Sequence, residues 1–187
     1  MIIVCSLNDL VSVCNSIKPK YLISVIDPGY APDTPDKVEK HLKLGFDDIT
    51  KISEDNIMFR TNIDSIPQLL PNEQHEESII NFTKDCKVKD DIVVHCWCGV
   101  SRSMAVAIFI FCKIFPNNIE SNVRYMRSIA AHANPNKLMV SLFEKYLNIE
   151  GQISEAFKKY PYTITYDCDT NFAPVSIFKI NEILNFK

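Results

Sequence analysis

The sequence has no long hydrophobic run and no leader-like segment at its start. Its longest apolar stretch runs from Met104 to Cys112, well short of the roughly 20 residues that a membrane helix needs. The opening residues, Met1 to Ser6, lack a basic flank and are too short for a secretory signal. The sequence therefore predicts neither a membrane span nor secretion.

Basic clusters and metal-ligand motifs are also missing. The net charge is −3, and this balance argues against nucleic acid as a general ligand. His41 and His132 have no cysteine or carboxylate partners at metal-ligand spacing, which argues against a zinc site. We therefore expect no nucleic-acid partner, no metal and no other cofactor.

The cysteines form neither an even disulfide framework nor a paired Cys-x-x-Cys pattern. They occupy positions 5, 14, 86, 96, 98, 112 and 168. This arrangement favours reduced thiols in a reducing compartment, so we expect a cytoplasmic protein. The 187 residues suffice for one α/β core but not for two comfortable domains, which predicts a single domain over residues 1–187.

What the chain does contain is a strand, a tight loop and a helix within residues 91–104. The β-branched run from Ile92 to Val94 is typical of a buried central strand, and the apolar run from Met104 to Phe111 suits a buried helix. The loop between them therefore ends at a helix N-terminus. Free backbone N–H groups and the helix dipole make such a site favourable for a tetrahedral dianion.

Two reactive side chains occupy the ends of this loop. Cys96 follows the strand, where the helix N-terminus and a nearby cation favour the thiolate form of a cysteine. Arg102 begins the helix, and its guanidinium can hold two phosphate oxygens at once. Attack of the thiolate on phosphorus would give a phosphocysteine, which water then hydrolyses. Ser103 can donate a hydrogen bond to the sulfur as it leaves.

At these residues the chain resembles the Cys-x5-Arg superfamily of protein tyrosine and dual-specificity phosphatases, whose loop reads His-Cys-x-x-Gly-x-Ser-Arg-Ser. The matching positions are His95, Cys96, Gly99, Ser101, Arg102 and Ser103, and the phosphate-binding loop implied by the resemblance is His95, Cys96, Trp97, Cys98, Gly99, Val100, Ser101 and Arg102. The resemblance implies a phosphatase of the phosphotyrosine protein phosphatase II-like fold.

A narrower resemblance points to a bacterial group of short tyrosine phosphatase-like proteins. It depends on residues 41–49, on the Trp97 that follows the nucleophile, and on residues 134–137 with the helix after them. Together these cover roughly residues 1–160. The role of residues 161–187, as a strand packed on the sheet edge or as an interaction segment, stays open.

The reaction also needs a proton donor for the leaving oxygen, usually a carboxylic acid. In the family an extended Leu-x-Leu segment leads into an aspartate, and here residues 42–48 end at Asp48 in the same way. The stretch from Asp48 to the nucleophile is longer than is common among the compact enzymes. Asp64, nearer the usual separation, and Asp47 are therefore alternatives.

The composition of the loop bears on its ligands and on redox chemistry. Residues 97–101 contain no Lys, Arg or His, and superfamily members that act on inositol phospholipids often carry basic residues there. Such lipids and polyphosphorylated RNA ends are therefore disfavoured. Cys98 is interpreted as a small apolar filler, because the two-residue spacing to Cys96 would strain a disulfide; the alternative is a resolving cysteine for an oxidised Cys96.

The remaining pattern alternates strands with helices. Strands are predicted at 2–5, 21–26 and 40–44, and helices at 7–17, 71–84, 101–115, 119–130 and 136–148. Residues 49–70 show no periodicity and are interpreted as a flap over the pocket. The alternation predicts an α/β fold with a central, mostly parallel sheet covered by helices on both faces, and with the loop at the carboxyl end of a strand.

The sequence thus predicts a protein tyrosine phosphatase that acts on phosphorylated proteins or peptides. One alternative is a dual-specificity enzyme that also accepts phosphoserine and phosphothreonine. Another is an interaction module that binds phosphate through the loop with little turnover. The structural feature that separates catalysis from mere binding is whether a carboxylate reaches the loop.

Overall fold

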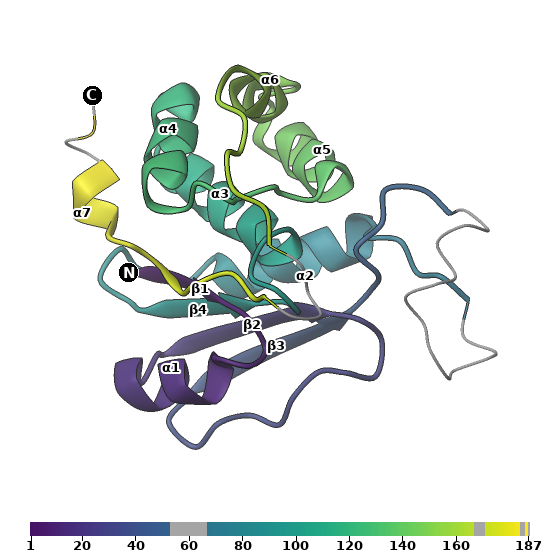
Figure 1. Cartoon of the computed structure of the whole chain (residues 1–187), viewed down its shortest axis with the longest axis vertical. Helices are drawn as coiled ribbons and strands as arrows, with labels where there is room; N and C mark the ends of the chain where they lie inside the picture. The colour runs from purple at the N-terminus through teal and green to yellow at the C-terminus, as the bar shows by residue number, and fades with distance from the viewer. Residues whose placement is uncertain (53–66, 167–170, 184–185, 187) are drawn as a thin grey trace.

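The computed structural model describes residues 1–52, 67–166, 171–183 and 186, and in them five strands form one sheet with the order β3-β2-β4-β1-β5 (Figure 1). The strands are β1 (Ile2–Cys5), β2 (Tyr21–Ile26), β3 (Lys40–Gly45), β4 (Ile92–His95) and β5 (Ser176–Phe178). The first four run parallel, and β5 pairs antiparallel with β1. The predicted α/β fold with a mostly parallel sheet is confirmed.

Helices cover both faces of the sheet, but unequally (Figure 1). On one face α1 (Leu10–Ile17) packs Leu10, Val13 and Cys14 against the strands. On the other lie α2 (Glu73–Thr83), α3 (Arg102–Ile114), α4 (Ile119–Ile129), α5 (Lys137–Leu147), α6 (Gln152–Lys159) and α7 (Ile180–Ile183). The larger core therefore sits on the second face.

Helix α3 lies at the centre of this larger core. Every residue from Arg102 to Cys112 is buried, as expected for a helix that is apolar on all sides. It contacts the sheet at β1, β2 and β4 and is covered by α4 and α5. Because its first residue is Arg102, the position of the guanidinium is fixed by the packing of the whole helix.

Two asparagines cap the N-termini of α2 and α5. Asn72 precedes α2, and its side-chain oxygen accepts hydrogen bonds from the backbone N–H groups of Gln74 and His75, both at 3.1 Å. Asn136 caps α5 in the same way. Each cap satisfies two N–H groups that have no partner inside the helix.

The C-terminal segment is tied to the sheet where the structure describes it. β5 extends the sheet beside β1, and Phe178 is fully buried against the rings of Phe111 and Tyr125. The backbone N–H of Lys179 donates to the Tyr125 hydroxyl at 3.0 Å. Residues 176–178 therefore form a strand at the sheet edge, which is one of the two roles considered for residues 161–187. None of the helices in the described part of the chain has the length and apolar character needed to cross a bilayer.

Candidate active site

The loop between β4 and α3 turns sharply under close contact from β1. Gly99 has a φ of +75°, a conformation that side chains rarely adopt, and a Cβ there would lie 3.0 Å from the carbonyl carbon of Cys5. Such a contact is tighter than nine in ten real Cβ contacts, so the neighbouring backbone would have to shift by a few tenths of an ångström. Two features therefore favour glycine at this position: its positive φ and the closeness of the β1 backbone.

Backbone hydrogen bonds hold the loop from two sides. The N–H of Leu7, just after β1, donates to the carbonyl of Trp97, and the N–H of Asn134, after α4, donates to the carbonyl of Val100; both distances are 3.0 Å. The loop is thus anchored to segments distant in sequence. These two bonds fix the path of the loop at Trp97 and at Val100.

The sulfur of Cys96 is buried and surrounded by donors. The N–H of Gly99 lies 3.3 Å from Sγ, and the hydroxyl oxygen of Ser103 lies 3.1 Å from it. The side chain as a whole is 2% exposed. Both groups lie within hydrogen-bonding distance of the sulfur.

The N-terminus of α3 is left open towards the loop. Ser101 occupies the N-cap position, but its side chain makes no capping bond to the helix. Its Oγ instead donates to Oδ1 of Asp48 at 2.7 Å. The first N–H groups of the helix therefore have no side-chain cap to compete with an anion.

The guanidinium of Arg102 is buried below the loop and held by acceptors. Its Nη1 donates to Oδ1 of Asp27 at 2.6 Å and to the carbonyl of Phe46 at 2.5 Å. Its Nε lies 3.7 Å from Oδ2 of Asp48 and makes no hydrogen bond within the described residues. Hydrogen bonds to Nη1 therefore fix one end of the guanidinium, while Nε has only the longer ion-pair contact with Asp48 among the described residues.

Asp27 is a site residue that the sequence analysis missed. Its Oδ1 accepts from Arg102, and its Oδ2 accepts from the indole Nε1 of Trp97 at 2.9 Å. One carboxylate therefore links the beginning and the end of the loop. The available signal was its position directly after β2, because the carboxyl ends of parallel strands meet at one edge of the sheet.

Asp48 reaches the loop. Besides accepting from Ser101, its Oδ1 accepts from the side-chain nitrogen of Asn136 at 2.8 Å. Asn136 uses its other atom, Oδ1, to cap α5, so one asparagine fixes both the helix and the carboxylate. The side chain of Asp48 remains 33% exposed, which leaves it open to solvent and to a substrate.

The other two acid candidates stand differently. Asp47 is buried, and its Oδ2 accepts from the N–H of Leu69 at 2.6 Å while its own N–H donates to the Leu69 carbonyl at 2.8 Å. These two bonds join the residue after Phe46 to Leu69. Asp64 and most of the predicted flap lie outside the described residues.

His95 orients the start of the loop through hydrogen bonds, as its position suggests. Its Nδ1 lies 3.4 Å from the carbonyl oxygen of Cys96, and its Nε2 lies 2.6 Å from the hydroxyl of Ser24. Burial is the main reason why the pKa of His95 is lowered to about 4. The ring is therefore neutral at neutral pH and does not serve as a charged partner for the sulfur.

The cysteines differ from the expectation in one respect. Cys5, Cys14, Cys86, Cys96 and Cys112 are free thiols, whereas Cys98 is disulfide-bonded. The expectation of reduced thiols is therefore wrong for Cys98. In this state it has no thiol with which to capture an oxidised Cys96. The described residues contain no group of three or more metal-ligating side chains.

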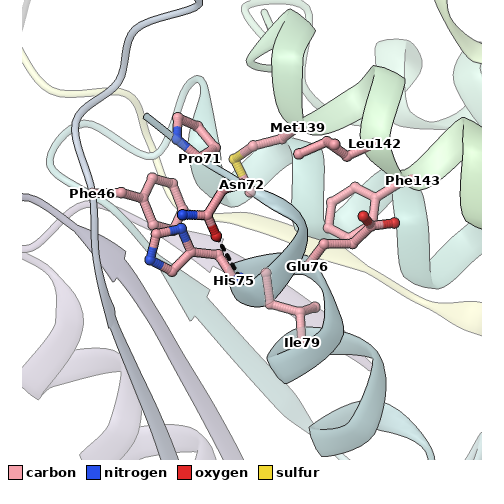
Figure 2. A pocket seen from close by; sticks show the side chains of 9 residues that line it. All are labelled: Phe46, Pro71, Asn72, His75, Glu76, Ile79, Met139, Leu142 and Phe143. Carbon is pink, nitrogen blue, oxygen red and sulfur yellow. Dashed lines mark hydrogen bonds between the residues drawn. The ribbon is translucent and has the colours of Figure 1, made fainter. Parts of the chain in front are cut away.

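A hollow of about 10 Å³ lies between α2 and α5, where it is also lined by Phe46 and Pro71 (Figure 2). The ring of His75 packs on Phe46, with centroids 4.7 Å apart. His75 Nδ1 and Glu76 Oε1 are buried here without a hydrogen-bond partner among the described residues. Burial lowers the pKa of His75 and raises that of Glu76. The hollow suits one water molecule and not a substrate.

Sheet order, helix placement and loop geometry together define the fold of the protein tyrosine and dual-specificity phosphatases. The chain is similar to the phosphatase domain of Yvh1 from Chaetomium thermophilum, at 18% identity and a TM-score of 0.55, with 79% of this chain and 90% of that one covered. It is also similar to PTPMT1 in complex with PI(5)P, at 12% identity and a TM-score of 0.52, covering 85% and 94%.

A third similar structure is the human tyrosine phosphatase-like serine/threonine/tyrosine-interacting protein. It shares 15% identity at a TM-score of 0.51, with 78% of this chain and 86% of that one covered. No family model and no curated protein matches the sequence.

Proposed function

We propose that the protein is a cysteine-dependent phosphomonoesterase that hydrolyses phosphotyrosine in proteins or peptides. Cys96 is the nucleophile, Arg102 holds the phosphate, Asp48 is the general acid and Ser103 assists the leaving sulfur. No metal or other cofactor takes part. We also propose that, within the superfamily, the chain is most similar to the bacterial group of short tyrosine phosphatase-like proteins.

The observation that carries the proposal is the contact of Asp48 with the loop. Its carboxylate lies within hydrogen-bonding distance of Ser101 and 3.7 Å from Arg102. A module that only binds phosphate has no need for a carboxylate here, because a second negative charge weakens the attraction between the loop and a dianion. A phosphatase needs one to protonate the leaving oxygen.

In the first step the sulfur of Cys96 attacks phosphorus, so that an S–P bond forms as the P–O bond to the substrate breaks. Asp48 gives its proton to the departing oxygen, which leaves as a neutral phenol or alcohol. The N–H groups of the loop and the guanidinium of Arg102 take up the charge of the three equatorial oxygens.

In the second step water attacks the phosphocysteine, and Asp48, now ionised, accepts the proton of that water. The S–P bond breaks and the sulfur leaves as a thiolate. The Ser103 hydroxyl, 3.1 Å from the sulfur, supplies the hydrogen bond that makes this leaving group better. Inorganic phosphate is released and the starting state returns.

Two features of the chain favour a phosphorylated protein over other ligands. Residues 97–101 have no basic side chain to hold the further phosphates of an inositol phospholipid, although the similar PTPMT1 was solved with PI(5)P. The side chain of Tyr30 is 44% exposed, and its ring packs beside Trp97 with centroids 5.2 Å apart. An aromatic surface of this kind beside the loop suits a phenyl phosphate.

The alternative of a dual-specificity enzyme depends on how deep the phosphate lies below the surface. Residues 53–66, within the predicted flap, lie outside the described residues. The interaction-module alternative has a precedent in fold, since one similar protein is named as an interacting protein. We prefer catalysis because the nucleophile, the arginine and a carboxylate at the loop are all present.

Hydrolysis of para-nitrophenyl phosphate with EDTA present tests the proposal. We expect metal-independent turnover by the wild type and none by Cys96→Ser, which keeps the size of the side chain. Cys86→Ser is the matched control, because Cys86 is a free thiol outside the loop, and its sulfur donates a hydrogen bond to the Phe82 carbonyl. It should keep full activity.

Each result has a definite meaning. Wild-type protein that does not cleave this activated ester would contradict the proposal and favour a binding module. Turnover that survives in Cys96→Ser would exclude the phosphocysteine route. Phosphotyrosine and phosphoserine peptides of one sequence, compared by phosphate release, then separate tyrosine specificity from dual specificity.

A further inference from the structure

A row of hydrogen-bonded side chains leads from the protein surface to the nucleophile. Oγ1 of the exposed Thr34 lies 2.9 Å from Nδ1 of His41. Nε2 of His41 lies 2.6 Å from Oγ of Ser24, and the same oxygen lies 2.6 Å from Nε2 of His95. The other ring nitrogen of His95 meets the carbonyl of Cys96. Two of these members, Ser24 and His95, are fully buried.

The row crosses three neighbouring strands on the face that α1 covers. His41 stands on β3, Ser24 on β2 and His95 on β4. Ser24 is the direct register partner of His95. His41 pairs with Leu22, two residues before Ser24 and on the same face of β2, so its ring reaches Ser24 along the diagonal.

The number of available protons allows only one assignment of donors and acceptors along this row of hydrogen bonds. The Ser24 hydroxyl has one proton but faces two imidazole nitrogens, so it donates to one and accepts from the other. The carbonyl of Cys96 can only accept, which places the ring proton of His95 on Nδ1. Its Nε2 must then accept from Ser24.

The same logic continues outwards. Because Ser24 donates to His95, its oxygen accepts the Nε2 proton of His41, whose Nδ1 then accepts from Thr34. Every donor has an acceptor in this arrangement. Both rings must be neutral for it, and burial lowers the pKa of His41, like that of His95, to about 4.

The opposite direction is unfavourable at the buried end. It would place the proton of His95 on Nε2 and turn the lone pair of Nδ1 towards the Cys96 carbonyl, so that two acceptors face each other out of water. Such a contact leaves a buried carbonyl unsatisfied. The hydrogen bond from His95 to the Cys96 carbonyl therefore selects the donors and acceptors of the whole row. The hydrogen bond from His41 to Ser24 supports the same pattern.

We propose that His41 is a positioning residue for the nucleophile: acting through Ser24, it fixes the tautomer and orientation of His95, which holds the Cys96 carbonyl and so aims the sulfur. This inference builds on the proposed function, because it gives the aimed sulfur a reaction to perform. The rest of the loop is anchored by Leu7 and Asn134, and His95 is the anchor at its beginning.

A pair of amide variants separates this role from simple packing. In His41→Gln the side-chain nitrogen takes the place of Nε2 and can donate to Ser24. In His41→Asn the shorter side chain puts its nitrogen where Nδ1 was, beside Thr34, and cannot reach Ser24. The two variants are alike in charge and polarity and lie on an edge strand, where His41 is only half-buried.

Two readouts are measured on the full chain at neutral pH. The first is kcat and KM for para-nitrophenyl phosphate. The second is the rate at which iodoacetamide alkylates Cys96, followed by mass spectrometry, which needs no turnover. We expect His41→Asn to lower both kcat and the alkylation rate about tenfold with KM nearly unchanged, and His41→Gln to stay within about threefold of the wild type.

A double variant tests whether His41 acts on His95 through Ser24. Ser24→Ala should reproduce the loss of His41→Asn, and combining the two should add little, because both break the same row. Equal behaviour of His41→Asn and His41→Gln, or losses that multiply in the double variant, would overturn the proposal. If the wild type shows no turnover, the proposed function fails, while the alkylation rates still decide the role of His41.

Discussion

Acidification from pH 7 to pH 5 is expected to destabilise the fold through its histidines. The chain has four, and burial is the main cause of a lowered pKa at each of them: His41, His75, His95 and His132. Each of these rings therefore takes up its proton at a lower pH in the folded state than in the unfolded chain. Protonation therefore favours unfolding.

The size of the effect follows from His95, which is fully buried. Its pKa is about 4 in the folded protein, against an ordinary value of 6.5. At pH 5 about 97% of unfolded chains but only about 9% of folded molecules would carry this proton. The resulting loss between pH 7 and pH 5 is about 2 kcal/mol.

The sign and the pH window follow from the same values. The contribution of His95 to the free energy of unfolding is complete above its unfolded pKa of 6.5 and decreases as the pH falls below that value. It stops changing below about pH 4, where His95 is protonated in the folded protein too. The other three histidines act in the same direction. Because domains are typically stable by only about 5–15 kcal/mol, the loss is a large share of the total.

Urea unfolding of the wild type and of His95→Asn at the two pH values measures this contribution. Asparagine does not titrate, and its amide can still donate to the Cys96 carbonyl in place of Nδ1. The wild type should lose at least about 2 kcal/mol of unfolding free energy, and the variant about 2 kcal/mol less than that. An equal loss in both proteins, or a wild type whose stability does not change, would refute the reasoning.

Three further predictions concern single side chains. Glu76→Gln should raise the free energy of unfolding by about 1 kcal/mol at pH 7 and leave it unchanged at pH 4, because burial raises the pKa of Glu76 and so penalises only the ionised form; an equal gain at both pH values would contradict this. Gly99→Ala should cost about 2 kcal/mol more in urea unfolding than Gly29→Ala, since both glycines have positive φ but only Gly99 has backbone within reach of a new Cβ; equal costs would show that the contact with β1 is relaxed. Asp48→Asn should lower the hydrolysis rate of a phosphotyrosine peptide by about 10²–10⁴ and remove the basic limb of its pH–rate profile; if the limb persists, Asp48 is not the acid.

Some element boundaries were predictable because local sequence decides them: the end of β3 near Gly45 and the start of α3 next to the loop depend on residues within one turn of each other. The glycine of the loop is another example, since its positive φ is a property of the turn itself. The helix expected at 7–17 begins only at Leu10, and α6 (Gln152–Lys159) was not predicted.

The partners of the site were not predictable, because they depend on strand order. Asp27 meets Arg102 only because β2 lies next to β4, a neighbour distant in the chain. Alternating strands and helices indicate a parallel sheet, but many orders satisfy that pattern. Ser24 and His41 belong to the same class, since each is an ordinary strand residue until its neighbours across the sheet are known.

Side chains with two functions were also hidden from the sequence. The oxygen of Asn136 caps α5, and the nitrogen of the same amide holds Asp48. Only the folded chain, which brings positions 48 and 136 together, gives the amide nitrogen its purpose.

The antiparallel strand β5 has a consequence for solubility. It covers the open side of β1, whose four residues are all buried and apolar. At the opposite edge, β3 carries Lys40 and Lys43, charged residues of the kind that discourage strands of two molecules from pairing. Without Ser176–Phe178, β1 would present a flat hydrophobic edge with free backbone groups. Three residues near the C-terminus thus keep the strand that supports the loop from becoming a template for aggregation.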